Sequence, residues 1–150
     1  MATQAYAPDL SNGADNFYQS KLLQKSVVSF DTLYGTKVAG NLFTPSDLPA
    51  GTRLPAIVVG HPMGAVKEQS ANLYAQKMAE KGYATLAIDL PFWGDSDGVR
   101  NRVLPDMYME AFSAAVDFLG TRDFVNRDRI GAIGICGSRS EEHTSELQSH

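Results

Sequence analysis

Three apolar runs, separated by two stretches with helical spacing, organise the middle of the chain. The runs lie in "RLPAIVVGHP", "YATLAIDLP" and "DRIGAIGIC". Each is apolar without a polar face, as in strands that are covered on both sides. We expect the run from Ala56 to Val59 to form a central strand.

Between the runs, apolar residues recur three and four positions apart, which predicts one buried face on each of two helices. The first set lies in "SANLYAQKMAEKG" and comprises Ala71, Tyr74, Ala75, Met78 and Ala79, with Gly82 placed for a left-handed C-terminal cap. The second set lies between Pro105 and Gly120 and comprises Tyr108, Ala111, Phe112, Ala115, Val116 and Leu119.

The N-terminal part of the chain has a different pattern. Residues 1–24 have no periodicity and are expected to form a loose lead-in. "KSVVSFDT" and "TKVAGNLFTP" are rich in β-branched and aromatic residues and are separated by "LYG", which predicts an antiparallel pair at a sheet edge. Buried strands that alternate with helices predict right-handed parallel crossovers. The expected fold is a three-layer α/β sheet over residues 25–138, antiparallel at its N-terminal edge and otherwise parallel.

The composition narrows the class of protein. With 150 residues, 43% of them hydrophobic and 20% charged, the chain has the profile of one soluble domain. A net charge of -4 argues against a nucleic-acid partner. The N-terminus lacks the pattern of a secretion signal, and no stretch of about 20 residues is apolar enough for a membrane span. We expect a cytoplasmic protein without cofactor or metal.

Cys136 is the lone cysteine, so it is either a buried thiol or a reactive one. Reactive groups in open α/β sheets gather beyond the carboxyl ends of the strands, which here read "GHPMG", "DLPFWGDSDG" and "GICGS". In the last of these, Gly134 and Ser138 stand two positions before and two after Cys136. Small residues at those positions permit a sharp turn that lifts a side chain clear of the sheet. The pattern favours Cys136 as a nucleophile.

The segment from Gly134 to Ser138 resembles the nucleophile elbow of the α/β-hydrolase superfamily. It is most similar to the dienelactone-hydrolase-like branch, in which cysteine commonly replaces serine. "GHPMGAVKEQSANLYAQKMAEKGYATLAIDLPFWGDSDG" resembles the oxyanion-hole loop, first helix and fourth strand of that branch, and the likeness covers most of Val27 to Ser138. The family's elbow closes with glycine where this chain has Ser138, so Ser138 stays the alternative nucleophile.

The resemblance also implies an oxyanion hole. Its two amides would belong to Gly137 and to Pro62 or Met63, and only Met63 of the latter two carries an N–H. His61 is expected to brace the loop and border the pocket, since the family takes its base from a segment near the C-terminus. Glu68 is expected to be a solvated carboxylate near the helix start.

The segment Gly94-Asp95-Ser96-Asp97-Gly98 also satisfies the written nucleophile pattern G-x-S-x-G. It does not follow a strand directly, and its two aspartates would oppose negative charge on Ser96. We interpret this loop as part of the pocket, with Phe92 and Trp93 as candidate apolar walls.

The end of the chain, "RSEEHTSELQSH", resembles the translation of a widely used DNA sequencing adapter. Residues 139–150 are therefore expected to be non-native, and the hydrolase sequence to be truncated after the elbow. The superfamily's acid and histidine follow its nucleophile, so we expect this fragment to be inactive. A triad with His143 is disfavoured, because a helix leaving the elbow would carry it roughly 10 Å away.

The predicted function is cleavage of an ester, thioester or lactone in a small-molecule acyl substrate, with acyl transfer to another acceptor left open. Oligomeric state is not predicted. A nucleotide-binding Rossmann-like domain is one alternative, because Gly60 and Gly64 follow a strand and Asp89 ends the next, but the glycine spacing differs from the fingerprint. A non-catalytic hydrolase-like binding module is the other.

Overall fold

A computed structural model of the chain describes residues 18–62, 65–98 and 104–135. The described ranges form five strands and two helices. In chain order these are β1 (Leu23–Asp31), β2 (Lys37–Pro45), β3 (Leu54–Gly60), α1 (Ser70–Ala79), β4 (Ala84–Ile88), α2 (Pro105–Gly120) and β5 (Val125–Gly134).

The five strands form one mixed sheet with the order β1-β2-β4-β3-β5. β1 pairs with β2, and β2 with β4, in antiparallel orientation, whereas β3 pairs with β4 and β5 in parallel. The predicted arrangement, antiparallel at the N-terminal edge and parallel beyond it, is confirmed. β3, predicted to be central from its apolar run, lies between two hydrogen-bonded neighbours.

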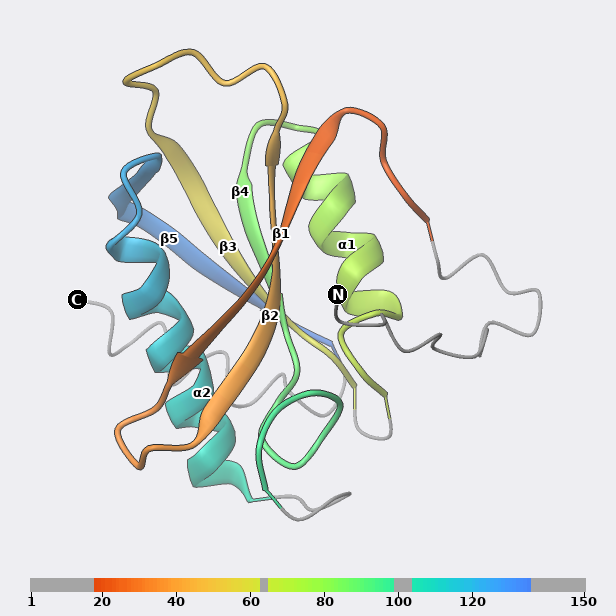
Figure 1. Ribbon diagram of the computed structural model, residues 1–150, viewed down its shortest axis with the longest axis vertical. Helices are drawn as coiled ribbons and strands as arrows, with labels where there is room; N and C mark the ends of the chain where they lie inside the picture. The colour runs from red at the N-terminus through yellow and green to blue at the C-terminus, as the bar shows by residue number, and fades with distance from the viewer. Residues whose placement is uncertain (1–17, 63–64, 99–103, 136–150) are drawn as a thin grey trace, which may run out of the picture.

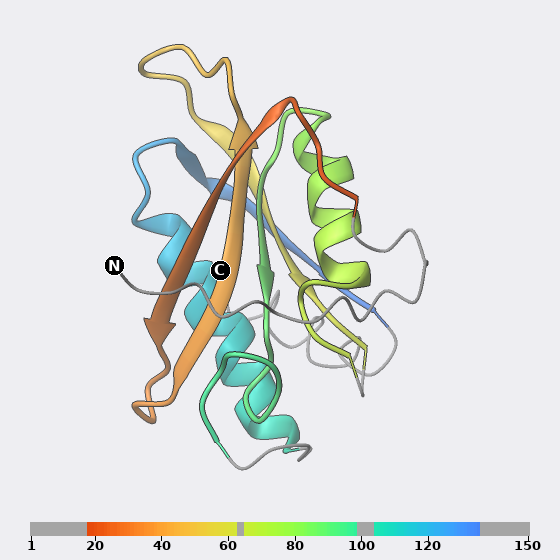
Figure 2. The ribbon, with the colours of Figure 1, turned by 45° about the vertical axis from the view of Figure 1, so that its right-hand side comes forward.

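The sheet is the middle of three layers (Figures 1 and 2), with α1 on one face and α2 on the other. Strand residues alternate between the two faces, so each helix covers its own apolar cluster. Val58, Leu86 and Phe112 are fully buried on the α2 face, and Val59, Ala75 and Ala87 on the α1 face. Burying a large side chain such as Leu or Phe contributes about 1.5–3 kcal/mol, so both clusters stabilise the sheet.

Helix α2 confirms its predicted pattern. Pro105 is its first residue, where a missing N–H costs no helical hydrogen bond, and the helix ends at Gly120. Tyr108, Phe112 and Leu119 of the predicted face are buried. Neither helix of the described ranges has the length and apolarity that a membrane span requires.

Helix α1 departs from its predicted face at one position. Tyr74 is 52% exposed, whereas Asn72 and Gln76 are buried. The sheet side carries Ala71, Ala75 and Ala79, whose small side chains let the helix approach the strands closely. Gly82 has the predicted positive φ, +103°, and its N–H donates to the Ala79 carbonyl.

Partners distant in sequence explain the buried amides. Gln76 accepts from the Ser20 N–H at 2.8 Å and donates to the Tyr18 carbonyl at 2.7 Å. Asn72 Oδ1 accepts from Asn41 Nδ2 at 3.2 Å. The polar side of α1 is therefore covered by β2 and by residues 18–20, which belong to the predicted lead-in.

Candidate active site

The ends of the three parallel strands meet at one edge of the sheet. The Ile135 N–H, just beyond β5, donates to the Gly60 carbonyl at the end of β3 at 3.3 Å. The Leu90 N–H, beyond β4, donates to His61 Nε2 at 3.0 Å. The structure thus brings together the described ends of the three strands, up to Pro62 after β3 and Ile135 after β5. The predicted nucleophile Cys136, its alternative Ser138 and the oxyanion residues Met63 and Gly137 lie outside the described residues.

His61 joins the loop after β3 to the loop after β4. Its Nδ1 lies 2.8 Å from the Pro62 carbonyl, which can only accept, so Nδ1 carries the proton and Nε2 accepts from Leu90. Burial lowers the pKa of His61, and this effect outweighs the opposing hydrogen bond to Pro62 and the charge of Asp89. A neutral imidazole with both nitrogens occupied braces the loop, and it has no free nitrogen with which to act as a base.

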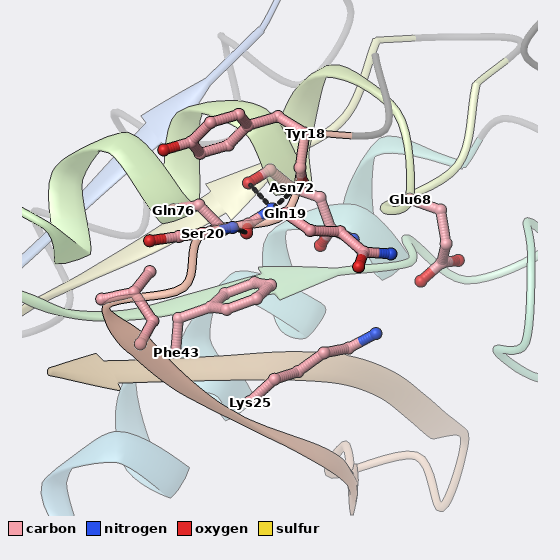
Figure 3. Close-up of a pocket in the computed structure, with 9 residues that line it drawn as sticks. Tyr18, Gln19, Ser20, Lys25, Phe43, Glu68, Asn72 and Gln76 are labelled. Atoms are coloured by element: carbon pink, nitrogen blue, oxygen red, sulfur yellow. Dashed lines mark hydrogen bonds between the residues drawn. The ribbon is translucent and has the colours of Figure 1, made fainter. Parts of the chain in front are cut away.

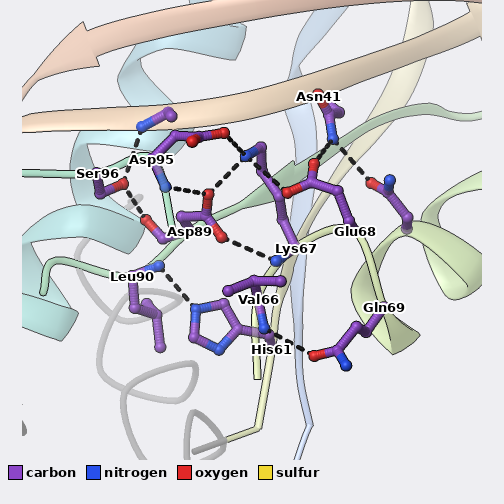
Figure 4. A network of polar contacts seen from close by, with 12 residues as sticks. Asn41, His61, Val66, Lys67, Glu68, Gln69, Asp89, Leu90, Asp95 and Ser96 are labelled. Atoms are coloured by element: carbon purple, nitrogen blue, oxygen red, sulfur yellow. Dashed lines mark hydrogen bonds and ion pairs between the residues drawn. The ribbon is translucent and has the colours of Figure 1, made fainter. Parts of the chain in front are cut away.

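Lys67, which is itself buried, is the centre of an ion cluster at the same edge (Figure 4). Its Nζ lies 2.5 Å from Asp89 Oδ2, 2.8 Å from Asp95 Oδ2 and 3.0 Å from Glu68 Oε1. Its backbone N–H donates to the other oxygen of Asp89 at 2.8 Å. The side chains of Lys67 and Asp89 are 1% and 0% exposed, so the attraction between them is little screened by water.

The charge of Lys67 is stabilised by its surroundings. Burial alone would lower the pKa of the ammonium, but the charge and hydrogen bond of Asp89, helped by Asp95 and Glu68, raise it above its ordinary value. The three carboxylates are also close enough together for a metal ion, with ligand oxygens within 4.8 Å of one another. Lys67 Nζ contacts an oxygen of each of them, so a lysine ammonium already occupies the position between the three carboxylates.

Sequence reasoning missed Lys67 as a site residue and weighed Asp89 only as a ribose-binding acid. Asp89 Oδ1 accepts from the Lys67 N–H, and Oδ2 accepts from Lys67 Nζ and from the Asp95 N–H. Both oxygens are occupied and buried, which contradicts the role proposed for Asp89 in nucleotide binding. One signal was available: a carboxylate that ends a fully apolar strand needs a cation close by.

Ser96 is part of a structural turn. Its Oγ accepts from the Ala39 N–H at 3.0 Å and donates to the Asp89 carbonyl at 2.6 Å, and the residue is 1% exposed. The hydroxyl therefore fastens the loop to β2 and to the end of β4. Gly94 in this loop has a φ of +54°, and a Cβ there would lie 2.3 Å from the Asp89 carboxylate. These contacts explain why the segment satisfies the pattern G-x-S-x-G without forming an elbow.

Phe92 and Trp93, the predicted pocket walls, lie in the loop after β4. Phe92 has a φ of +78°, is 8% exposed and belongs to the apolar cluster under α2. Trp93 is partly buried and donates from Nε1 to the Tyr108 hydroxyl. Its ring lies edge-on to the His61 ring, with 6.3 Å between the ring centroids. Trp93 thus borders the edge where the strand ends meet, whereas Phe92 packs into the core.

A cavity of about 330 Å³, lined by both polar and apolar residues, opens beside α1 (Figure 3). Phe43 lies in its wall, with Lys25 and Glu68 among the lining residues. Glu68, 38% exposed, is shared between this cavity and the ion cluster, because its Oε2 accepts from Asn41 at 2.6 Å and its Oε1 contacts Lys67. Glu68 was predicted to be a solvated carboxylate, and it is partly so.

Comparison with known proteins gives relatives of one fold. PA2218 of Pseudomonas aeruginosa, an uncharacterized protein, is 52% identical over 122 residues, which are 81% of this chain and 33% of that protein. Its crystal structure superimposes with a TM-score of 0.80 at 48% identity, over 85% of this chain and 40% of that one. The α/β hydrolase GrgF from Penicillium sp. sh18 gives a TM-score of 0.67 at 30% identity, over 76% and 38% of the two chains. The chain carries part of an α/β-hydrolase fold.

Two further proteins that are similar to this chain carry the names of enzymes. The thiohydrolase aneE of Aspergillus aculeatus is 31% identical over 114 residues, which are 75% of this chain and 34% of that protein. The dienelactone hydrolase-like phosphotriesterase P91, from metagenomic libraries, shares the fold with a TM-score of 0.62 at 22% identity, over 80% and 53% of the chains. No protein-family model matches the chain. The chain spans about a third of the length of the curated relatives described here.

Proposed function

We propose that the protein is an α/β hydrolase that cleaves an ester, thioester or lactone through Cys136. The observation that carries the proposal is the hydrogen bond from the Ile135 N–H to the Gly60 carbonyl. It holds the residue before Cys136 against the end of β3, from which the proposed oxyanion loop departs. In α/β sheets this edge is where reacting groups gather.

The proposed reaction is nucleophilic acyl transfer. The Cys136 thiol gives its proton to a general base, and the thiolate attacks the carbonyl carbon to form a tetrahedral intermediate. The amides of Met63 and Gly137 donate to its oxyanion. Collapse expels the alcohol or thiol, which takes up the proton, and water then releases the acid from Cys136. Both nitrogens of His61 are already hydrogen-bonded, which supports the proposal that another residue is the general base. In the superfamily the general base is a histidine that follows the nucleophile in the chain.

The substrate class is a small acyl compound. The name of the relative aneE, a thiohydrolase, supports the inclusion of thioesters beside esters. Lactones are included because the sequence resembles the dienelactone-hydrolase-like branch. Transfer of the acyl group to an acceptor other than water uses the same first step. The 150 residues by themselves are proposed to be inactive, because they correspond to about a third of the length of PA2218 and of the thiohydrolase aneE.

The test is mutation of Cys136 in the full-length protein that contains this segment, assayed with p-nitrophenyl esters and with an acyl thioester. Cys136→Ala is expected to lower kcat by at least about 10³-fold, as loss of a nucleophile does. Ser138→Ala is the matched control for the alternative nucleophile and is expected to retain activity. Full activity of Cys136→Ala would reject the proposal, and loss confined to Ser138→Ala would transfer the role to Ser138.

A further inference from the structure

We propose that the Lys67–Asp89 pair positions the oxyanion loop of this enzyme, so that its integrity sets kcat. The inference rests on the function proposed above. It concerns two residues that are expected to touch no substrate and that act through the backbone around them.

Both ends of the loop from His61 to Lys67 are hydrogen-bonded to two consecutive residues, Asp89 and Leu90. At its start, His61 Nε2 accepts from the Leu90 N–H at 3.0 Å. At its end, the Lys67 N–H and Nζ donate to the two oxygens of Asp89, at 2.8 and 2.5 Å. Figure 4 shows these contacts side by side. The span from His61 to Lys67, which contains the proposed donor Met63, is therefore tied at both ends to the end of β4.

The Lys67–Asp89 pair, which is the anchor at the end of the loop, is stiff. Lys67 and Asp89 are 1% and 0% exposed, so sliding the loop would separate two opposite charges in a dry environment. Asp89 Oδ2 also accepts from the Asp95 N–H at 2.9 Å. Gly94 leaves the room that the carboxylate occupies, because a Cβ there would lie 2.3 Å from it.

The stiffness of this anchor affects kcat of the proposed reaction. An oxyanion donor works only if its N–H is already aimed at the position that the negative charge will occupy. Misplacement of a reacting or stabilising group by about 1 Å costs on the order of 10²-fold in rate. Since the oxyanion develops after the substrate is bound, a loosened loop lowers kcat and leaves KM nearly unchanged.

The main test is the double variant Lys67→Met/Asp89→Asn in the full-length protein, which removes both buried charges together. We expect kcat to fall about 10²-fold with KM within about threefold, at a temperature well below the melting point of the variant. The matched control is Lys37→Met/Asp31→Asn, which makes the same two changes at exposed residues that are register partners in β1 and β2. The control is expected to keep both kinetic parameters.

A second variant keeps every charge and moves the anchor. Gly94→Ala places a methyl group against the Asp89 carboxylate, whereas Gly51→Ala, at a φ of +84° with nothing within 4 Å, carries a comparable backbone cost without that contact. Gly94→Ala is expected to lower kcat at least about 10-fold and Gly51→Ala to leave it unchanged. This comparison decides the matter if the double variant does not fold.

The outcomes separate this inference from the proposed function. If Cys136 is essential and both the double variant and Gly94→Ala keep wild-type kcat while melting earlier, the pair is only a stabilising feature and the inference is overturned. If Cys136→Ala is fully active, the proposed function itself fails, whatever the pair does. A kcat loss that Gly51→Ala and the Lys37/Asp31 control do not share supports the inference.

Discussion

Replacing Lys67 by Met tests the physical description of the ion cluster most sharply. Met keeps much of the volume of the lysine chain and removes its charge. Asp89, which is 0% exposed, loses the ammonium at 2.5 Å but keeps the N–H groups of residue 67 and Asp95 at 2.8 and 2.9 Å. Removing one partner of a buried ion pair costs about 3–5 kcal/mol, and the two remaining donors place the expected loss near the lower end, at about 3 kcal/mol.

The double variant Lys67→Met/Asp89→Asn gives the comparison that isolates the unpaired charge. Both charges are absent, and the side-chain amide introduced by Asp89→Asn can still accept from one of the two backbone N–H groups. We expect the double variant to be more stable than Lys67→Met by about 1–2 kcal/mol, because a buried orphan charge costs more than a neutral amide with one unmet donor.

The assay is urea unfolding of the full-length protein at pH 7, with the wild type, both single variants and the double variant forming one cycle. A loss below about 1 kcal/mol for Lys67→Met would refute the reasoning, because that is the range of an exposed pair. Additive losses in the cycle would refute it as well.

Two further predictions follow from the same edge of the sheet. Burial lowers the pKa of His61, so below about pH 6.5 the unfolded chain binds a proton more readily than the folded chain does. The free energy of unfolding therefore falls with decreasing pH, by up to about 1.4 kcal/mol per pH unit. The melting temperature of His61→Gln should depend less steeply on pH between pH 7.5 and 5.5, and an unchanged slope would count against a buried neutral imidazole. Ser96→Ala removes the hydrogen bonds to the Ala39 N–H and the Asp89 carbonyl, and should lower the free energy of unfolding by about 1–3 kcal/mol. The variant should keep acyl hydrolysis. A folded variant without turnover would instead indicate that Ser96 is the nucleophile.

The parts of the fold that depend on local pattern could be predicted from the sequence. The apolar run of β3 identifies a central strand, because a strand buried on both sides has no polar positions. The spacing of apolar residues from Pro105 to Gly120 identifies a helix, because a helix buried on one face repeats its apolar residues every three to four positions. The strand ends then had to meet at one edge, since parallel strands present their carboxyl ends together.

Features that depend on distant partners could not be predicted in this way. Tyr74 was expected to be buried because it fits the apolar spacing, but α1 instead buries Asn72 and Gln76, whose amides meet groups of Asn41, Tyr18 and Ser20. Lys67 is the clearest case, because a lysine in a loop is normally solvated. Its burial follows from Asp89, which stands 22 residues later in the chain.

The most direct measurement of the central claim is the intact mass of the full-length protein, quenched during turnover of an acyl ester or thioester, followed by peptide mapping. The account predicts a transient mass increase equal to one acyl group, located on Cys136 and absent from Cys136→Ala. An acyl group on Ser138 or Ser96, or steady turnover by Cys136→Ala, would contradict it.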